Sequence, residues 1–303
     1  MNAKVVIGMP VFNGENFVAE AVASILGQSM GDWRLVIADN ASTDGTEEIC
    51  RAFAQRDRRV EYHRHASNIG AAPNYNFVFR PGDASYFKWA AHDDTLGPTF
   101  LERCAARLDE DASLAMCHCR TATINEHGER IGTYDNELRL AGARARDRLR
   151  HVLWAGYFNE VFGVFRAECV ARTRLHGSFV GSDRNFMAEL VLQGDVGYVE
   201  EYLFERRDHP GCYVRAVRSE EERLRWFDTS KGVAPRLAGL TKFRHYVSSV
   251  LRLGLSRGER LACLRELLNW AGHRGLEVAT GAGQRYRSRL VAEQNVRGQL
   301  EGG

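Results

Sequence analysis

Residues 86–94 read Tyr86-Phe87-Lys88-Trp89-Ala90-Ala91-His92-Asp93-Asp94, an apolar run that stops abruptly on two adjacent carboxylates. The run is rich in aromatics and too short for a helix, so it predicts a β-strand. In an open α/β sheet, ligands bind beyond the carboxyl ends of the strands. Two neighbouring acids there would repel each other without a cation between them, and carboxylate oxygens suit Mg²⁺ or Mn²⁺. The alternative is that Asp93 and Asp94 cap a helix that begins at residues 95–98.

The composition is that of an ordinary globular protein, since 44% of the 303 residues are hydrophobic and 26% are charged. Seven cysteines without a CxxC pair argue against a disulfide framework or a zinc ribbon. Cys117 and Cys119 lie in an alternating stretch typical of a strand, so we expect them in the core. We find no signal peptide and no apolar run of about 18 residues, which predicts a cytoplasmic chain that does not span a membrane.

Charge divides the chain into two parts. Residues 216–303 hold 16 Lys and Arg against 9 Asp and Glu, a net charge of +7, while residues 1–215 hold 25 against 30, a net charge of −5. This asymmetry predicts a boundary near residue 215 and an anionic partner for the basic C-terminal part.

Strand and helix patterns alternate along the first hundred residues. Buried-type strands are predicted at 4–10, 33–38, 60–64 and 86–90, and helical stripes follow the first three. This order predicts an α/β fold with a mostly parallel central sheet flanked by helices. Because no G-x-G-x-x-G follows the first strand and no P-loop motif occurs, dinucleotide oxidoreductases and P-loop NTPases are disfavoured.

Four motifs lie at the predicted strand ends, and their order and spacing resemble the family 2 glycosyltransferases of the GT-A fold. They are Pro10-Val11-Phe12-Asn13, Asp39-Asn40-Ala41-Ser42-Thr43-Asp44-Gly45-Thr46, Asn68-Ile69-Gly70 and His92-Asp93-Asp94. The resemblance extends from the N-terminus to about Arg215, which makes 1–215 the expected catalytic domain. It implies transfer of a sugar from a nucleoside diphosphate sugar of the UDP or dTDP type, with inversion at the anomeric carbon.

The resemblance also implies site residues. Metal binding, of Mn²⁺ or Mg²⁺, would fall to Asp94 and Asp93. The nucleotide sugar would be bound by Pro10, Val11, Phe12, Asn13, Asp39, Asn40, Asp44, Arg64, Asn68, Gly70, Asp93, Arg206 and His209. Many members carry a further acid beside the paired aspartates, whereas this chain has Ala91 and His92.

Asp183 lies before the helical stripe Phe186, Met187, Leu190 and Val191. It could cap that helix. In the family that the chain resembles, an acid at this place is the general base, and the chemistry requires one because an alcohol must lose its proton as it attacks. We therefore expect Asp39, Asp93, Asp94 and Asp183 to converge on a single cleft.

Downstream, residues 205–213 form a predicted loop that contains Arg206, Arg207 and His209. Family members often carry an Arg or His here that closes over the diphosphate, and Arg suits bidentate phosphate contact. The alternative is a solvated basic loop.

The region 216–303 is predicted to be basic and α-helical, with apolar stripes at 237–251 and 261–271. Its helices either pack on the catalytic domain with a solvated basic face, or contact an anionic membrane or lipid-phosphate acceptor. No motif for nucleic-acid binding accompanies the charge.

These observations favour an inverting, metal-dependent glycosyltransferase whose acceptor is a hydroxyl of a glycan or lipid-linked glycan in surface-glycan or glycolipid assembly. Two alternatives stay open: a sugar-nucleotide binding protein without turnover, and a membrane-surface scaffold that acts through the basic helices.

Overall fold

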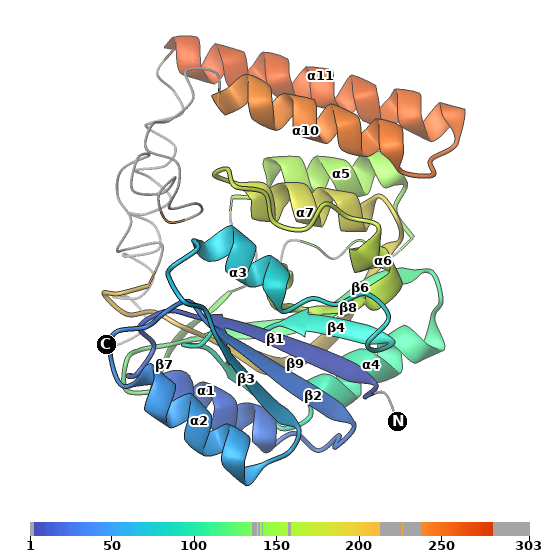
Figure 1. Ribbon diagram of the computed structural model, residues 1–303. Coiled ribbons are helices and arrows are strands. Elements are labelled where there is room, and N and C mark those ends of the chain that lie inside the picture. Colours follow the sequence, from blue (N-terminus) through green and yellow to red (C-terminus); the bar gives the residue numbers. More distant parts are fainter. Residues whose placement is uncertain are drawn as a thin grey trace, which may run out of the picture.

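A central sheet with helices on both faces forms the framework of the computed structural model, which describes residues 3–134, 138, 140, 142–156, 159–212, 226 and 238–280 (Figure 1). The strands are β1 (Val5–Val11), β2 (Trp33–Asp39), β3 (Val60–Arg64), β4 (Tyr86–Trp89), β5 (Thr95–Leu96), β6 (Leu114–Ile124), β7 (Arg130–Tyr134), β8 (Val164–Arg166) and β9 (Asp195–Arg207). The helices are α1 (Val18–Leu26), α2 (Thr46–Arg56), α3 (Ala71–Phe77), α4 (Phe100–Glu110), α5 (Ala145–Trp154), the short η1 (Glu160–Phe162), α6 (Ala167–Ala171), α7 (Ser182–Val191), α10 (Ala238–Arg252) and α11 (Arg257–Thr280).

The first half of the sheet is parallel, as the alternating pattern predicted. The strand order is β3-β2-β1-β4, and the register places Val5 opposite Trp33 on one side and Tyr86 on the other. At the far end, Val11 pairs with Asp39, and Asp39 pairs with Arg64. The polar motifs that follow these strands therefore lie along one edge of the sheet.

The second half of the sheet mixes directions, in the order β8-β6-β9-β5 after β4. β8 is antiparallel to both β4 and β6, whereas β6 and β9 are parallel. β5 pairs antiparallel with the end of β9, through Thr95 opposite Glu205 and Leu96 opposite Phe204. This pairing brings residues near 205 beside the paired acids at 93 and 94.

Two hydrophobic cores lie on opposite faces of the sheet. One core packs α1 and α4 against the sheet through Val18, Val22, Phe100 and Leu108. The other, on the face that carries α3, α5 and α7 in Figure 1, includes Trp89, Leu149, Phe186 and Leu190. Strands buried on both faces explain why their sequences read as continuous apolar runs.

Several local predictions need correction. β1 ends at Val11, one residue beyond the predicted end near Pro10. Residues 95–98 do not begin a helix: Thr95 and Leu96 form β5, and α4 starts only at Phe100 after Thr99. Asp93 and Asp94 therefore cap no helix. The expected burial of Cys117 and Cys119 within a strand is confirmed.

The basic C-terminal part is helical where the structure describes it, as expected. The inner faces of α10 and α11 pack on α5 and α7, and Tyr246, Val250, Cys263 and Leu267 belong to the same core as Trp89. The predicted boundary near residue 215 falls outside the described residues, and the division into two domains stays a prediction. Among the described residues, every helix is too short or too polar to cross a bilayer.

Glu189 on α7 anchors α10. Its carboxylate is fully buried and accepts hydrogen bonds from the Arg174 backbone N–H (2.7 Å) and the Ser249 hydroxyl (2.7 Å). Arg252 adds an ion pair at 3.1 Å. Since Ser249 and Arg252 both belong to α10, this one acid joins the C-terminal helices to the sheet-bound part of the chain.

We predict that Glu189→Ala lowers the free energy of unfolding by ~1–3 kcal/mol, because it removes the acceptor of the Arg174 N–H and the carboxylate that Arg252 and Ser249 share, although Ser249 keeps the His245 carbonyl. Urea denaturation measures the change. The matched control is Glu168→Ala on α6, whose exposed carboxylate pairs only with Arg172 and whose loss should cost under ~0.5 kcal/mol. Equal destabilisation by both substitutions would contradict this role of Glu189.

Candidate active site

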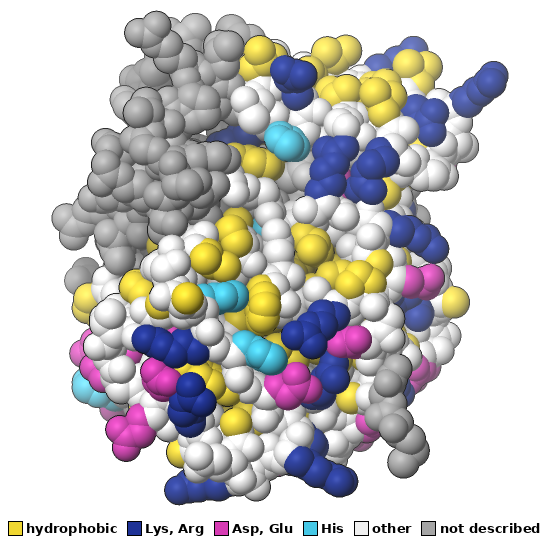
Figure 2. Space-filling model, in the orientation of Figure 1, with side chains coloured by type: hydrophobic (Ala, Val, Ile, Leu, Met, Phe, Trp, Pro, Cys, Tyr) yellow, Lys and Arg dark blue, Asp and Glu magenta, His cyan; other side chains and the backbone are white. Residues whose placement is uncertain are grey.

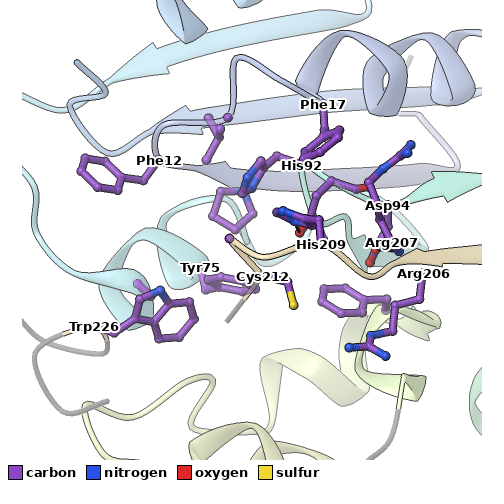
Figure 3. Close-up of a pocket in the computed structure, with 18 of the residues that line it drawn as sticks. Phe12, Phe17, Tyr75, His92, Asp94, Arg206, Arg207, His209, Cys212 and Trp226 are labelled. Carbon is purple, nitrogen blue, oxygen red and sulfur yellow. Dashed lines mark hydrogen bonds and ion pairs between the residues drawn. The ribbon is translucent and has the colours of Figure 1, made fainter. Parts of the chain in front are cut away.

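A cavity of about 1000 Å³ opens at the carboxyl ends of β1 and β4. Segments far apart in sequence line it: residues 10–17 after β1, 91–94 after β4, 180–184 at the start of α7 and 206–212 at the end of β9. Figure 3 shows Phe12, Tyr75, His92, Asp94, Arg206 and His209 around this space. The sequence prediction that a ligand site lies at this edge of the sheet agrees with the position of the cavity.

Pro10, Val11, Phe12, Asn13 and Asn40 all line the cavity, as predicted. Asn13 has a positive φ of 52° and is held by the neighbouring loop. Its backbone N–H donates to Ser42 Oγ (2.9 Å), and its side-chain oxygen accepts from the Thr43 N–H (2.9 Å). The loop after β2 therefore fixes the shape of the loop after β1, and the exposed Phe12 ring is presented at the mouth.

Asp39 does not line the cavity, contrary to the expected convergence of four aspartates. Its carboxylate is completely buried and accepts from the Ser42 N–H (2.8 Å), the Tyr62 hydroxyl (2.6 Å) and Arg64 Nη1 (2.9 Å). Burial and the bond to Asp39 raise the pKa of Tyr62. Asp39 and Arg64 thus brace the loop behind the cavity wall, and contact of either with a nucleotide stays a prediction.

Asp44, Asn68 and Gly70 also lie behind the wall. Asp44 accepts from the Thr46 hydroxyl (2.6 Å) and the Glu15 N–H (3.1 Å), which ties the start of α2 to the loop before α1. Asn68 Oδ1 accepts from the Asn40 side chain (3.0 Å) and the Gly70 N–H (2.9 Å). Gly70 has a positive φ of 88°, a conformation that glycine adopts without steric cost.

The paired acids both line the cavity. Asp94 is 8% exposed, and its Oδ1 accepts from the Arg207 backbone N–H at 2.9 Å. Burial, followed by the charge of Asp93, raises the pKa of Asp94 to about 8. Burial also raises the pKa of Asp93, but the hydrogen bond with His209 Nε2 at 3.1 Å and the nearby His92 bring it below its ordinary value. Asp93 thus has a side-chain partner in His209, whereas Asp94 accepts from the Arg207 backbone N–H and is influenced by the charges of Arg206 and Lys88.

This donor set fits a divalent cation held jointly with a substrate. The described residues contain no cluster of three or more His, Cys, Asp or Glu side chains with metal-binding geometry. Asp94 still presents a carboxylate whose pKa is raised by burial and by the adjacent Asp93, despite the charges of Arg206 and Lys88. Mg²⁺ is typically held by one or two carboxylates plus substrate phosphates and water, so Asp94 and Asp93 would hold such an ion.

The basic residues after residue 205 divide into two kinds. Both arginines line the cavity, but Arg206 is half-buried whereas Arg207 is 1% exposed. Arg207 donates to the backbone oxygens of Asp93 (2.8 Å) and Asn125 (3.0 Å) and to the Glu20 carboxylate (2.6 Å). Both arginines belong to β9 rather than to a loop. Arg207 is therefore committed within the protein, which corrects its prediction as a diphosphate contact.

Asp183 lies in the first turn of α7, on the cavity wall across from the loop of Phe12. The residue before the helix is Gly181, with a φ of 85°, so the prediction that Asp183 caps α7 is wrong. Within the part of the chain that the structure describes, the Asp183 carboxylate makes no hydrogen bond or ion pair with another residue. A carboxylate without partners in a cavity is available to accept a proton from a ligand.

Sequence reasoning missed several residues of the wall, among them Tyr75, Phe162, His176 and Trp226. Tyr75 and His176 lie against each other, with ring centroids 5.1 Å apart. His176 follows α6 in a segment without periodicity, and no local motif marks it.

Comparison with known proteins identifies a family whose sequence model matches this chain. The family model described as "Glycosyl transferase family 2" matches residues 6–159. The putative glycosyltransferase EpsE of Bacillus subtilis (strain 168) is 30% identical over 128 residues, which make up 42% of this chain and 46% of that protein. The putative teichuronic acid biosynthesis glycosyltransferase TuaG of the same strain is 30% identical over 94 residues, 31% of this chain and 37% of that protein. The chain thus matches less than half the length of these relatives.

Solved structures support the fold. S. aureus TarS 1-349 matches with a TM-score of 0.65 at 15% identity, covering 88% of this chain and 71% of that chain. The structure of the same protein in complex with UDP-GlcNAc matches with a TM-score of 0.64 at 16% identity. The match covers 88% of this chain and 72% of that chain. The mannosyltransferase PcManGT from Pyrobaculum calidifontis, in complex with GDP-Man and Mn²⁺, matches with a TM-score of 0.54 at 15% identity. The match covers 100% of this chain and 89% of that chain.

Proposed function

Because this chain belongs to glycosyl transferase family 2, we propose that it moves a sugar from a nucleoside diphosphate sugar to a hydroxyl acceptor, with inversion at the anomeric carbon. One observation carries the proposal. The carboxylate of Asp183, which makes no hydrogen bond or ion pair with another described residue, lines the same cavity as the paired acids Asp93 and Asp94. A single cavity can therefore hold a proton acceptor on one side and a diphosphate site on the other.

The donor would occupy the side formed by the loops after β1 and β4. Phe12 offers an exposed ring to a base, and Asn13 offers its side-chain amide to a ribose. The buried Asn40 amide instead holds Asn68, Ile69 and Gly70 in place behind the wall. UDP-GlcNAc and GDP-Man in the structures of the related fold support a nucleotide sugar in general. We propose a UDP or dTDP sugar.

The reaction needs one proton acceptor and one site for the leaving group. Asp183 would take the proton of the acceptor hydroxyl as its oxygen attacks the anomeric carbon. Arg206 and His209 lie on the cavity wall where they can contact the departing diphosphate. A Mn²⁺ or Mg²⁺ ion, when bound by Asp94 and Asp93, would neutralise charge on that diphosphate.

The acceptor is proposed to be a hydroxyl of a glycan or a lipid-linked glycan, in surface-glycan or glycolipid assembly. The name of TuaG, a putative teichuronic acid biosynthesis glycosyltransferase, supports this context. A protein that binds sugar nucleotides without catalysing transfer would need the residues that contact the nucleotide, but it would not need a general base. The availability of Asp183 favours an enzyme over that alternative.

A contact with an anionic membrane is the second part of the proposal. The exposed faces of the two C-terminal helices both combine leucines with an arginine. The residues are Leu240, Arg244 and Leu251 on α10, and Leu261, Arg265 and Leu268 on α11. In Figure 2, basic and apolar side chains intermix over the region where these helices lie. Leucines with interspersed arginines suit a surface that inserts shallowly among anionic head groups.

We predict that Asp183→Asn lowers the rate of sugar transfer by about 10²–10⁴-fold, the usual contribution of a general base. The affinity for UDP, measured by calorimetry, should change little because Asp183 lies on the acceptor side. Asp147→Asn is the matched control, since Asp147 also lies in the first turn of a helix, α5, but outside the cavity. Undiminished transfer by Asp183→Asn would remove the base assignment.

We predict that Asp94→Ala and Asp94→Asn weaken Mn²⁺-dependent UDP binding by about tenfold or more, as loss of a ligand group does at metal sites. The asparagine retains an oxygen for the Arg207 N–H, which separates metal binding from local misfolding. Asp109→Ala is the control, because Asp109 contacts Lys4 near the opposite edge of the sheet. Mn²⁺ enhancement of UDP binding that survives in both Asp94 variants would rule out this site.

We predict that the full chain binds vesicles containing phosphatidylglycerol and not vesicles of phosphatidylcholine alone. At ~1 kcal/mol per basic residue near an anionic surface, the double substitution Arg244→Gln with Arg265→Gln should weaken vesicle binding by about 30-fold. Arg51→Gln with Arg103→Gln, two exposed arginines on α2 and α4, should leave it unchanged. Equal flotation with both kinds of vesicle, or none with either, would contradict the membrane contact.

A further inference from the structure

His176 occupies the cavity wall beside Asp183, in the segment between α6 and α7. Aromatic side chains enclose its imidazole, with centroid distances of 5.1 Å to Tyr75, 4.7 Å to Trp89 and 5.6 Å to Phe186. The side chain of Asn76 holds its backbone from both sides: Oδ1 accepts from the His176 N–H (2.9 Å), and Nδ2 donates to the His176 carbonyl (2.8 Å). The ring is therefore held in a defined place by α3 and α7.

Burial at this position is energetically unfavourable for a histidine whose role is only to fill the core. His176 is 7% exposed, and its Nε2 is buried without a hydrogen-bond partner. A buried polar atom left without a partner costs ~1–3 kcal/mol. The residue before it, Leu175, has a positive φ of 56°, a conformation that leucine rarely adopts. A phenylalanine would fill the same aromatic enclosure without an unpaired nitrogen, so packing alone does not account for a histidine on the cavity wall.

The charge state of the ring limits what that group can be. Burial lowers the pKa of His176 to about 4, and the negative charge of Asp183 partly opposes this effect. The imidazole is therefore neutral near pH 7, with one N–H donor and one acceptor nitrogen. Such a ring does not attract a phosphate or a carboxylate by charge, but it hydrogen-bonds readily to a hydroxyl.

We infer that His176 binds a second hydroxyl of the acceptor, next to the hydroxyl that Asp183 deprotonates. The inference rests on the proposed glycosyl transfer and deepens it. His176 and Asp183 both line the cavity and lie close enough to interact electrostatically, and the described residues offer no hydrogen bond to either His176 Nε2 or the Asp183 carboxylate. Two such neighbours fit a vicinal diol, as on a sugar ring or polyol, better than an isolated alcohol.

The roles of the two residues differ in the transfer step. The attacked carbon forms a bond to the acceptor oxygen, and its bond to the diphosphate oxygen breaks with the electron pair leaving on the diphosphate. The proton of the attacking hydroxyl goes to Asp183. His176 exchanges no proton and orients the acceptor through the neighbouring hydroxyl.

Kinetics with glycerol as a surrogate acceptor and UDP sugars as donors test this role. His176→Phe, which keeps a ring but no polar atom, should raise the KM for glycerol by about tenfold, equivalent to ~1.4 kcal/mol. His176→Gln keeps a donor and an acceptor and should stay within about threefold of the unmodified protein. An unchanged KM in the phenylalanine variant, or equal impairment in both variants, would overturn the inference.

Nuclear magnetic resonance of histidine ¹⁵N atoms in the full chain gives a second test that needs no turnover. The His176→Gln spectrum assigns the signals. With UDP and Mg²⁺ present at pH 6, we expect a neutral His176 ring whose signals shift on adding glycerol but not 1-propanol, which has a single hydroxyl. A charged ring, no shift with glycerol, or equal shifts with both alcohols would overturn the inference. Complete absence of sugar transfer would instead count against the proposed function, and this spectrum would still decide the place of His176.

Discussion

The buried guanidinium of Arg207 is the constraint on which the cavity depends. Removing an arginine from water is costly unless nearly all its donors find acceptors. Arg207 meets this demand by reaching the backbone of Asp93, the hairpin turn at Asn125 and the carboxylate of Glu20. Its own backbone N–H holds Asp94. One residue at the end of β9 therefore fixes the loop after β4, the β6–β7 turn and α1 relative to one another.

The four aspartates that the sequence placed at this site differ in the hydrogen-bonding partners that the fold gives them. Asp39 is surrounded by donors and belongs to the support of the wall. Asp93 has His209, whereas Asp94 is buried beside a like charge, and its pKa rises to about 8. Asp183 has no hydrogen-bonding partner among the described residues. Groups that the fold leaves unsatisfied face the cavity, where a cation, a diphosphate or a hydroxyl can complete them.

Local patterns predicted the parallel half of the sheet, because each strand and helix there carries its own periodicity and the connections between them are short. They could not predict that Arg207 is buried, since this depends on pairing between β9 and segments over a hundred residues away. Asp39 was misplaced for the same reason: Tyr62 and Arg64 reach it from the neighbouring strand. His176 carries no local signal, and only the folded chain brings it to Asp183.

The central claim is that Asp93 and Asp94 mark the diphosphate side of one cavity and Asp183 its acceptor side. Diffraction at the manganese absorption edge, from crystals of the full chain grown with UDP and Mn²⁺, tests it most directly. The account predicts an anomalous peak in contact with Asp94, the diphosphate between that peak and Arg206, and Asp183 across the cavity from the phosphates. A manganese ion bound away from Asp94, or UDP outside this cavity, would contradict it.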